Sequence, residues 1–285
     1  MTEARGIRRI QIHSKSDLVT LIQSLESEPI IVTNFCEIFP DFSHSIFSKY
    51  SSIERLKNID SEDMVGLVSD TTCGGGMPLK DALIVLETEG GYINGWEYGG
   101  VGGELDEVLS SISLIPKKFG VAGRMLDSVM RWIFISHKVA SSGSDWHVDP
   151  IGSAAFMFMV RGEKKWFIGD SFVDTIGVGD FLLVPPGIPH RIENVGSGLN
   201  IAVTHNWVTD SGRCERLMWE AVQKFLIDHL SSTIAEMNDS GQVDNILMGL
   251  VMILIHLDEG RAREIVPLHL QQRLETLRRT TTDMD

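Results

Sequence analysis

Two histidines and one aspartate have the types and spacing of ligands for a single metal ion. His147 and Asp149 are two positions apart, so both side chains leave the same face of an extended strand. His190 follows 43 positions after His147, directly after the turn-forming run Pro185–Pro189, and can complete the set. Two imidazoles and one carboxylate occupy one face of an octahedral ion and leave the other positions open, as non-haem Fe(II) oxygenases require. The spacing predicts a metal site at His147, Asp149 and His190.

Polar side chains also fall where a strand would normally bury apolar ones. Lys164 and Trp166 share one strand face, so an ammonium group is expected inside the fold, where it needs an anion. Alternate residues from Asn200 to Asn206 share a face that is small and polar, Thr204 among them. Such a face suits the lining of a ligand cavity. We therefore expect a cavity that binds an anion beside the metal site.

The segment Gly179–Asn194 matches the second motif of the cupin superfamily, G-x5-P-x-G-x2-H-x3-N, at every specified position. Together with the segment Ser144–Pro150, which reads SDWHVDP, it resembles the JmjC branch of that superfamily. Members of this branch, such as factor inhibiting HIF, are 2-oxoglutarate-dependent oxygenases. The resemblance covers roughly Pro29 to Trp207 and is densest from Trp132 onward.

The resemblance implies Fe(II) at His147, Asp149 and His190, with O2 and 2-oxoglutarate as cosubstrates. Lys164 stands in a Gly-x-Lys-Lys-Trp sequence similar to the one whose first lysine binds the far carboxylate of 2-oxoglutarate in the family. By the same resemblance the remaining cosubstrate contacts are Ser144, Tyr92, Thr204 and Asn206. The interval between the ligands is shorter than in many JmjC proteins, and Met157 stands where some relatives have a polar contact.

The resemblance implies hydroxylation of a C–H bond, with a protein side chain as the favoured substrate. Demethylation of an N-methyl group and hydroxylation of a tRNA base or a small molecule are alternatives. A cupin that only binds a ligand, or an isomerase, is an alternative of a different class, and Lys164 argues against it. The net charge of −14 gives no support for a nucleic-acid partner.

The pattern along the chain predicts a mainly β protein with helical additions. The expected architecture is a double-stranded β-helix, or jelly roll, with C-terminal helices. Residues 1–130 are expected to form an α/β part that packs on the barrel, 131–208 the barrel, and 209–285 a helical appendage. Strands are expected over residues 9–13, 29–33, 64–68, 92–96, 132–136, 154–160, 164–168, 180–184, 191–194 and 200–207, and helices over 17–25, 42–56, 78–87, 213–229, 244–257 and 261–279. Ser16 is the expected N-cap of the first helix, and Trp146 is expected in the core.

Several features bound the partners and the compartment. The three cysteines are far apart and odd in number, which favours free thiols in a reducing compartment. No long apolar run follows the first residues, so no signal peptide is expected and an intracellular, cytoplasmic protein is predicted. The apolar run Ile246–Leu257 is too short to cross a membrane comfortably. It predicts a helix covered on all sides, either by a second copy in a homodimer or within its own subunit.

Overall fold

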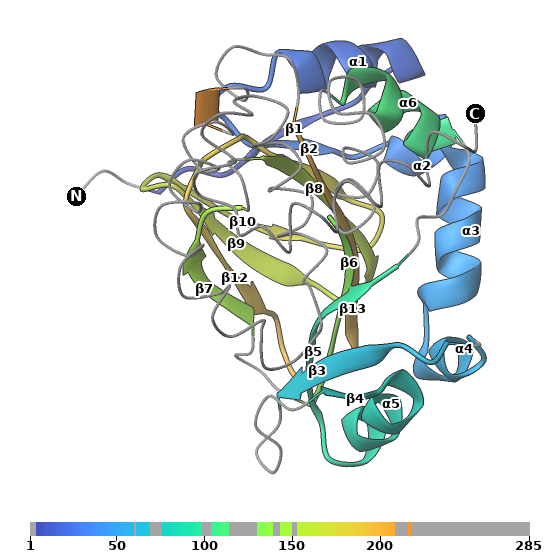
Figure 1. Cartoon of the computed structure of the whole chain (residues 1–285). Helices are drawn as coiled ribbons and strands as arrows, with labels where there is room; N and C mark the ends of the chain where they lie inside the picture. Colours follow the sequence, from blue (N-terminus) through green and yellow to red (C-terminus); the bar gives the residue numbers. More distant parts are fainter. Residues whose placement is uncertain are drawn as a thin grey trace, which may run out of the picture.

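Two β-sheets and a layer of helices make up the described part of the chain (Figure 1). The computed structural model describes residues 4–59, 61–68, 76–98, 104–113, 130–138, 143–149, 153–208 and 216–217. The strands are β1 (Arg8–Ile10), β2 (Ile30–Val32), β3 (Met64–Val68), β4 (Gly76–Pro78), β5 (Gly91–Glu97), β6 (Arg131–His137), β7 (Gly143–His147), β8 (Ala154–Arg161), β9 (Lys164–Ile168), β10 (Phe172–Ile176), β11 (Phe181–Val184), β12 (His190–Asn194) and β13 (Asn200–Trp207). The helices are α1 (Lys15–Gln23), α2 (Phe35–Ile38), α3 (Pro40–Tyr50), α4 (Ile53–Lys57), α5 (Leu79–Thr88) and α6 (Glu104–Ile112).

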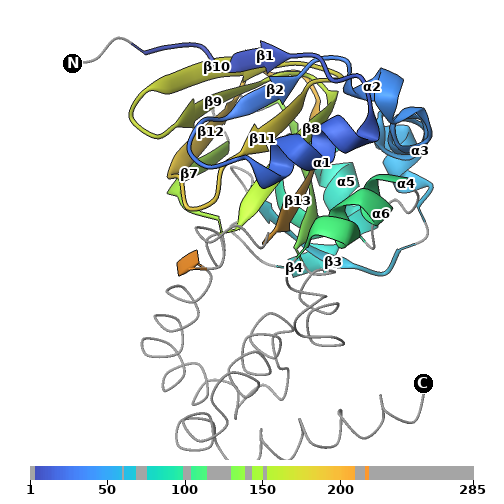
Figure 2. The ribbon, with the colours of Figure 1, turned by 90° about the horizontal axis from the view of Figure 1, so that it is seen from above.

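The strands are divided between a large and a small sheet. The large sheet has the order β1-β2-β11-β8-β13-β6-β5-β3-β4, and the small sheet has the order β10-β9-β12-β7. All neighbouring strands are antiparallel except β1 and β2. Figure 2 shows the helices on the side of the large sheet that faces away from the small sheet. The large sheet is therefore covered on both faces.

Strand β8 explains why the large sheet can be buried on both sides. Its run Ala154–Val160 is apolar at every position and fully buried. Met157 and Met159 face the small sheet and join one core cluster, whereas Phe156 and Phe158 face the helices and join another. A strand that is buried on both faces reads as a continuous apolar run rather than an alternating one.

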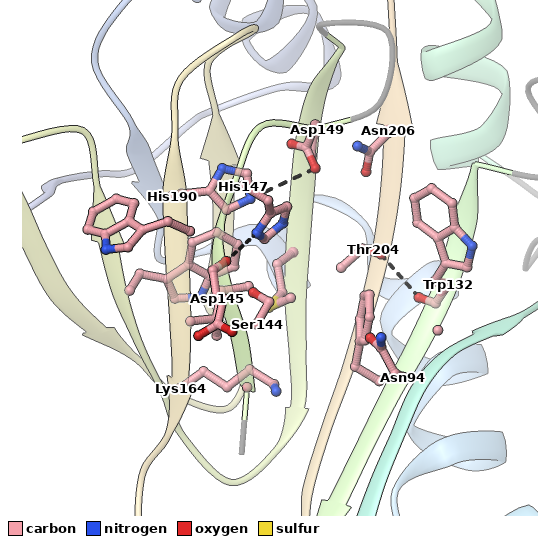
Figure 3. A pocket seen from close by; sticks show the side chains of 18 of the residues that line it. Asn94, Trp132, Ser144, Asp145, His147, Asp149, Lys164, His190, Thr204 and Asn206 are labelled. Carbon is pink, nitrogen blue, oxygen red and sulfur yellow. Dashed lines mark hydrogen bonds and ion pairs between the residues drawn. The ribbon is translucent and has the colours of Figure 1, made fainter. Parts of the chain in front are cut away.

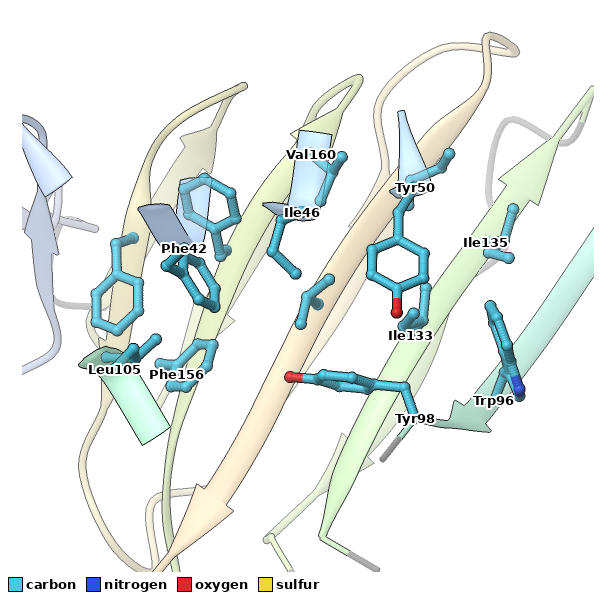
Figure 4. Close-up of a cluster of buried hydrophobic side chains, with 14 of the residues drawn as sticks. Phe42, Ile46, Tyr50, Trp96, Tyr98, Leu105, Ile133, Ile135, Phe156 and Val160 are labelled. Carbon is cyan, nitrogen blue, oxygen red and sulfur yellow. The ribbon is translucent and has the colours of Figure 1, made fainter. Parts of the chain in front are cut away.

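The core beneath the helices is rich in aromatic rings. Phe35 of α2 stacks on Phe181 of β11 with ring centroids 3.9 Å apart, and Phe42 of α3 meets Phe158 edge to face at 5.5 Å. Figure 4 shows the same layer farther along, where Tyr50 approaches side chains of β5 and β6. Burying each such side chain stabilises the fold by about 1.5–3 kcal/mol, so this layer fixes the large sheet firmly.

The structure corrects two details of the predicted helices. Ser14, not Ser16, is the N-cap of α1, because the Ser14 hydroxyl accepts from the Asp17 N–H while the Asp17 carboxylate accepts from the Ser14 N–H. The single helix predicted over 42–56 is two helices, because the backbone leaves helical geometry at Ser52, whose side chain caps α4. Helix α6, which the sequence interpretation missed, carries buried Leu105 and Leu109.

The prediction of a mainly β fold is confirmed. Strands β1 to β5, from the first 130 residues, extend the same sheet as four later strands, so this part contributes strands as well as helices. The predicted appendage at 209–285, its helices and the homodimer through them lie outside the described residues, apart from Arg216 and Leu217. Among the described residues, no helix has the length and apolar character needed to span a membrane.

Candidate metal centre

The three predicted ligands come together at one end of the small sheet (Figure 3). His147 is the last residue of β7 and His190 the first of β12, and the two are direct partners in the antiparallel pair. Asp149 follows two residues after β7. One ligand atom from each side chain lies within 4.8 Å of the others, and Asp149 Oδ1 is 3.8 Å from His190 Nε2. The three predicted ligands therefore lie close enough together to hold one metal ion.

Backbone carbonyls orient both imidazoles toward the same point. His147 Nδ1 lies 2.7 Å from the carbonyl oxygen of Asp145, and His190 Nδ1 lies 3.0 Å from that of Ile188. A carbonyl can only accept, so each Nδ1 carries the proton and each Nε2 keeps a free lone pair. Burial lowers the pKa of His190 against the opposing effect of Asp149, which favours the neutral form that binds metals. The donor set therefore fits a divalent metal that accepts nitrogen and oxygen ligands.

A β-bulge in β7 brings Ser144 to the same cavity as His147. On β12, His190 pairs with His147 and Ile192 pairs with Ser144, so three steps on β7 match two on β12. The extra residue leaves both side chains on the inner face although their spacing is odd. Sequence periodicity alone would place them on opposite faces.

The same bulge overturns the expectation for Trp146. The side chain is 54% exposed at the edge of the cavity instead of lying in the core. The guanidinium carbon of Arg191 lies 6.0 Å from the ring centroid, at the outer limit of a cation–π contact. The expectation assumed a regular strand with one buried face. The bulge at Asp145 and Trp146 breaks that alternation.

A cavity of about 540 Å³ lies between the two sheets and holds all the predicted site residues. The small sheet and the residues just after β7 supply Ser144, His147, Asp149, Lys164 and His190, whereas the large sheet supplies Tyr92, Thr204 and Asn206. Figure 3 shows Lys164 on the wall that carries the two histidines, with Thr204 on the opposite wall. A cavity of this size is typical of a small-molecule site.

Lys164 is the most unusual side chain in this cavity. It is 1% exposed, and its ammonium group donates to Asn194 Oδ1 at 2.7 Å. Nζ also lies 5.6 Å from the ring centroid of Tyr92, and no carboxylate among the described residues forms an ion pair with it. Burial lowers the pKa of Lys164 to about 7. Within the described part of the chain the ammonium group therefore has no counter-ion, and an anionic ligand would supply one.

The other predicted contacts differ in how their polar atoms are used. The Ser144 hydroxyl is buried and has no hydrogen-bond partner among the described residues. Thr204 donates to the Trp132 carbonyl at 3.3 Å, and the Asn206 amide donates to the Ser153 hydroxyl at 3.1 Å. Tyr92 is buried, and burial raises the pKa of its phenol. Ser144 therefore has an unsatisfied group to offer a ligand, whereas Thr204 and Asn206 each already donate to the protein.

Two residues of the cavity region were missed as functional residues. Asn194 is the partner of Lys164 and also the last specified position of the cupin-type motif, so the motif itself was the available signal. Trp166 lies on the inner face of β9 and lines the cavity, two positions after Lys164. Its face could be read from the sequence, but its closeness to His190, with ring centroids 5.3 Å apart, could not.

Comparison with known proteins does not assign the chain to a family. No protein-family model matches the chain, and a search of the curated proteins finds no significant match.

Proposed function

We propose that strands β6 to β13 form the double-stranded β-helix of the cupin superfamily. The support is their order: within the large sheet the neighbours are β11, β8, β13 and β6, and within the small sheet they are β10, β9, β12 and β7. Of these eight strands, β6, β8, β11 and β13 therefore belong to the large sheet, and β7, β9, β10 and β12 belong to the small sheet. Eight antiparallel strands shared equally between two facing sheets are the arrangement of a jelly roll.

We further propose that the protein is an Fe(II)- and 2-oxoglutarate-dependent oxygenase that hydroxylates a C–H bond. The observation that carries this proposal is the buried Lys164 ammonium, without a carboxylate partner among the described residues, in the same cavity as the His147, Asp149 and His190 set. The far carboxylate of a keto acid bound at the metal would supply the counter-ion that this lysine needs. A ligand-binding cupin or an isomerase, the alternative of another class, explains the histidines but gives Lys164 a role only if its own ligand is an anion.

Each side chain has a defined task in this proposal. His147, Asp149 and His190 hold Fe(II) and leave its remaining positions to ligands. When bound, Fe(II) couples the oxidative decarboxylation of 2-oxoglutarate by O2 to hydroxylation of the substrate, which yields succinate, CO2 and an alcohol. Lys164 and Ser144 bind the far carboxylate of 2-oxoglutarate. Tyr92 packs above Lys164, and the apolar walls of the cavity exclude water.

A protein side chain is the proposed substrate, and the exposed rim of the cavity supports it. Trp146 is half-exposed there, and Asn94 and Asp145 are also exposed lining residues. An aromatic ring beside amide and carboxylate groups offers both apolar contact and hydrogen bonds to a peptide. Demethylation and hydroxylation of other substrates use the same set of residues.

Release of CO2 from 1-labelled 2-oxoglutarate, with succinate measured in parallel, tests the activity directly. Wild-type protein loaded with Fe(II) is expected to release CO2 slowly alone and faster with a substrate peptide. Lys164→Ala is expected to raise the required 2-oxoglutarate concentration strongly. Lys165→Ala is the matched control, because Lys165 lies on the opposite face of β9, with its ammonium 5.1 Å from the Phe167 ring centroid. Absence of succinate with the loaded wild-type protein would reject the proposal.

A further inference from the structure

The inner face of the small sheet presents its side chains in rows across the strands. One row pairs His190 with His147 at the metal end. The next row contains Trp166, Ile192 and Ser144, because Ile192 pairs with Trp166 on one side and with Ser144 on the other. A further row pairs Lys164 with Asn194. The middle row therefore lies between the metal ligands and the buried ammonium group.

The middle row carries two hydrogen-bond donors that the protein does not use. The Trp166 indole is 3% exposed and lines the cavity, and its Nε1 has no hydrogen-bond partner among the described residues. The Ser144 hydroxyl, on the other side of Ile192, is in the same condition. Buried donors in native proteins nearly always have a partner, because leaving one unsatisfied is destabilising. Both residues line the cavity, so the acceptor atoms of a ligand bound there could satisfy the two donors.

We propose that the Trp166 N–H donates a hydrogen bond to the far carboxylate of the bound cosubstrate, together with Ser144 and Lys164. The inference rests on the proposed function. Adjacent rows are two residues apart, or about 6.6 Å along the strands. An extended five-carbon diacid that contacts the metal through one end therefore brings its other end to the middle row. There the long side chain of Lys164 can reach it from the next row.

The chain offers a matched control for the indole N–H. Trp207 is fully buried, and its Nε1 also lacks a hydrogen-bond partner among the described residues. Trp207 packs in the core beneath the helices, with its ring 6.0 Å from that of Phe156, and it does not line the cavity. Trp→Phe at either position removes one buried N–H and keeps an aromatic ring. Of the two lost donors, only that of Trp166 belongs to a residue that lines the cavity.

Binding to protein loaded with Mn(II), measured by calorimetry without turnover, tests the proposal. Two ligands are titrated: 2-oxoglutarate, and oxalate, which can chelate the metal but has no far carboxylate. We expect Trp166→Phe to raise the Kd for 2-oxoglutarate about tenfold or more, the loss typical of a hydrogen bond to a charged group. Its Kd for oxalate is expected to stay unchanged, and Trp207→Phe is expected to alter neither value.

Each other outcome overturns the inference in a recognisable way. Equal weakening of both ligands would mean that Trp166 acts by packing on His190, and no weakening would mean that its N–H is unused. Wild-type protein that binds oxalate but not 2-oxoglutarate would instead reject the proposed cosubstrate, and the inference with it. If Trp166→Phe does not fold, benzothienylalanine at position 166 keeps the bicyclic ring, replaces the N–H with sulfur and permits the same comparison.

Discussion

Replacing Lys164 with methionine is expected to abolish cosubstrate binding and yet to stabilise the folded protein at neutral pH. Lysine has an ordinary pKa of 10.5, and burial lowers the value in the folded protein to about 7. At about 1.4 kcal/mol for each tenfold change in the protonation equilibrium, the folded state loses about 4 kcal/mol at pH 7 relative to the unfolded chain. Methionine removes this loss and fills a similar volume. The hydrogen bond to Asn194 is lost as well, which costs about 1–3 kcal/mol.

The net expectation is that Lys164→Met raises the free energy of unfolding at pH 7 by about 2 kcal/mol. The pH dependence gives a sharper test. Between pH 7 and 10.5 the unfolded wild-type chain keeps a proton that the folded protein has released, so wild-type stability rises with pH relative to the variant. The variant's advantage should therefore shrink by about 1.4 kcal/mol per pH unit and reverse near pH 9. Urea denaturation of both metal-free proteins across the range measures it. A variant that is less stable at pH 7, by an amount that does not change with pH, would refute the reasoning.

Three further predictions follow from the described geometry and the sequence. His147→Ala or Asp149→Ala is expected to lose bound iron and CO2 release while keeping the wild-type circular dichroism, and undiminished iron on metal analysis would contradict the site. Gly143→Ala is expected to lower the melting temperature by several degrees and to impair CO2 release. The reason is that an added Cβ would lie 1.8 Å from the Ile192 carbonyl oxygen and push β7 away from β12. An unchanged melting curve would contradict this contact. The apolar run around Ile253 predicts a homodimer by light scattering, and a single 31.7 kDa species at micromolar concentration would exclude it.

Much of the candidate site could be predicted because its parts are local. The bounds of β9 and β13 follow from their composition and flanking turn residues, and the strict alternation of β9 places Lys164 inside. The turn before His190 could also be read from the sequence. Gly187 has a positive φ of 67°, which glycine adopts readily, and an added Cβ there would lie 2.6 Å from a Leu217 methyl carbon.

What the sequence could not provide depends on pairing between distant strands. The bulge in β7 exists only relative to β12, so neither the inward direction of Ser144 nor the exposure of Trp146 follows from local periodicity. The short strand β10 was missed for a similar reason. Its side chains are only partly buried except Ile176, and the strand is recognisable mainly by its pairing with β9. Tertiary context decided these features, and local propensity did not.

The two walls of the cavity come from different sheets. The small sheet and the residues just after β7 carry the three proposed metal ligands and also Lys164 and Ser144. The distances among these side chains therefore depend mainly on pairing between neighbouring strands. The opposite wall, with Asn94 and Trp132, belongs to the large sheet. Substitutions at Asn94 or Trp132 are therefore expected to reshape the cavity without moving the proposed metal ligands. Under the proposed function, successive changes at these two positions are expected to alter the choice of substrate, while the small sheet keeps the metal ligands in place.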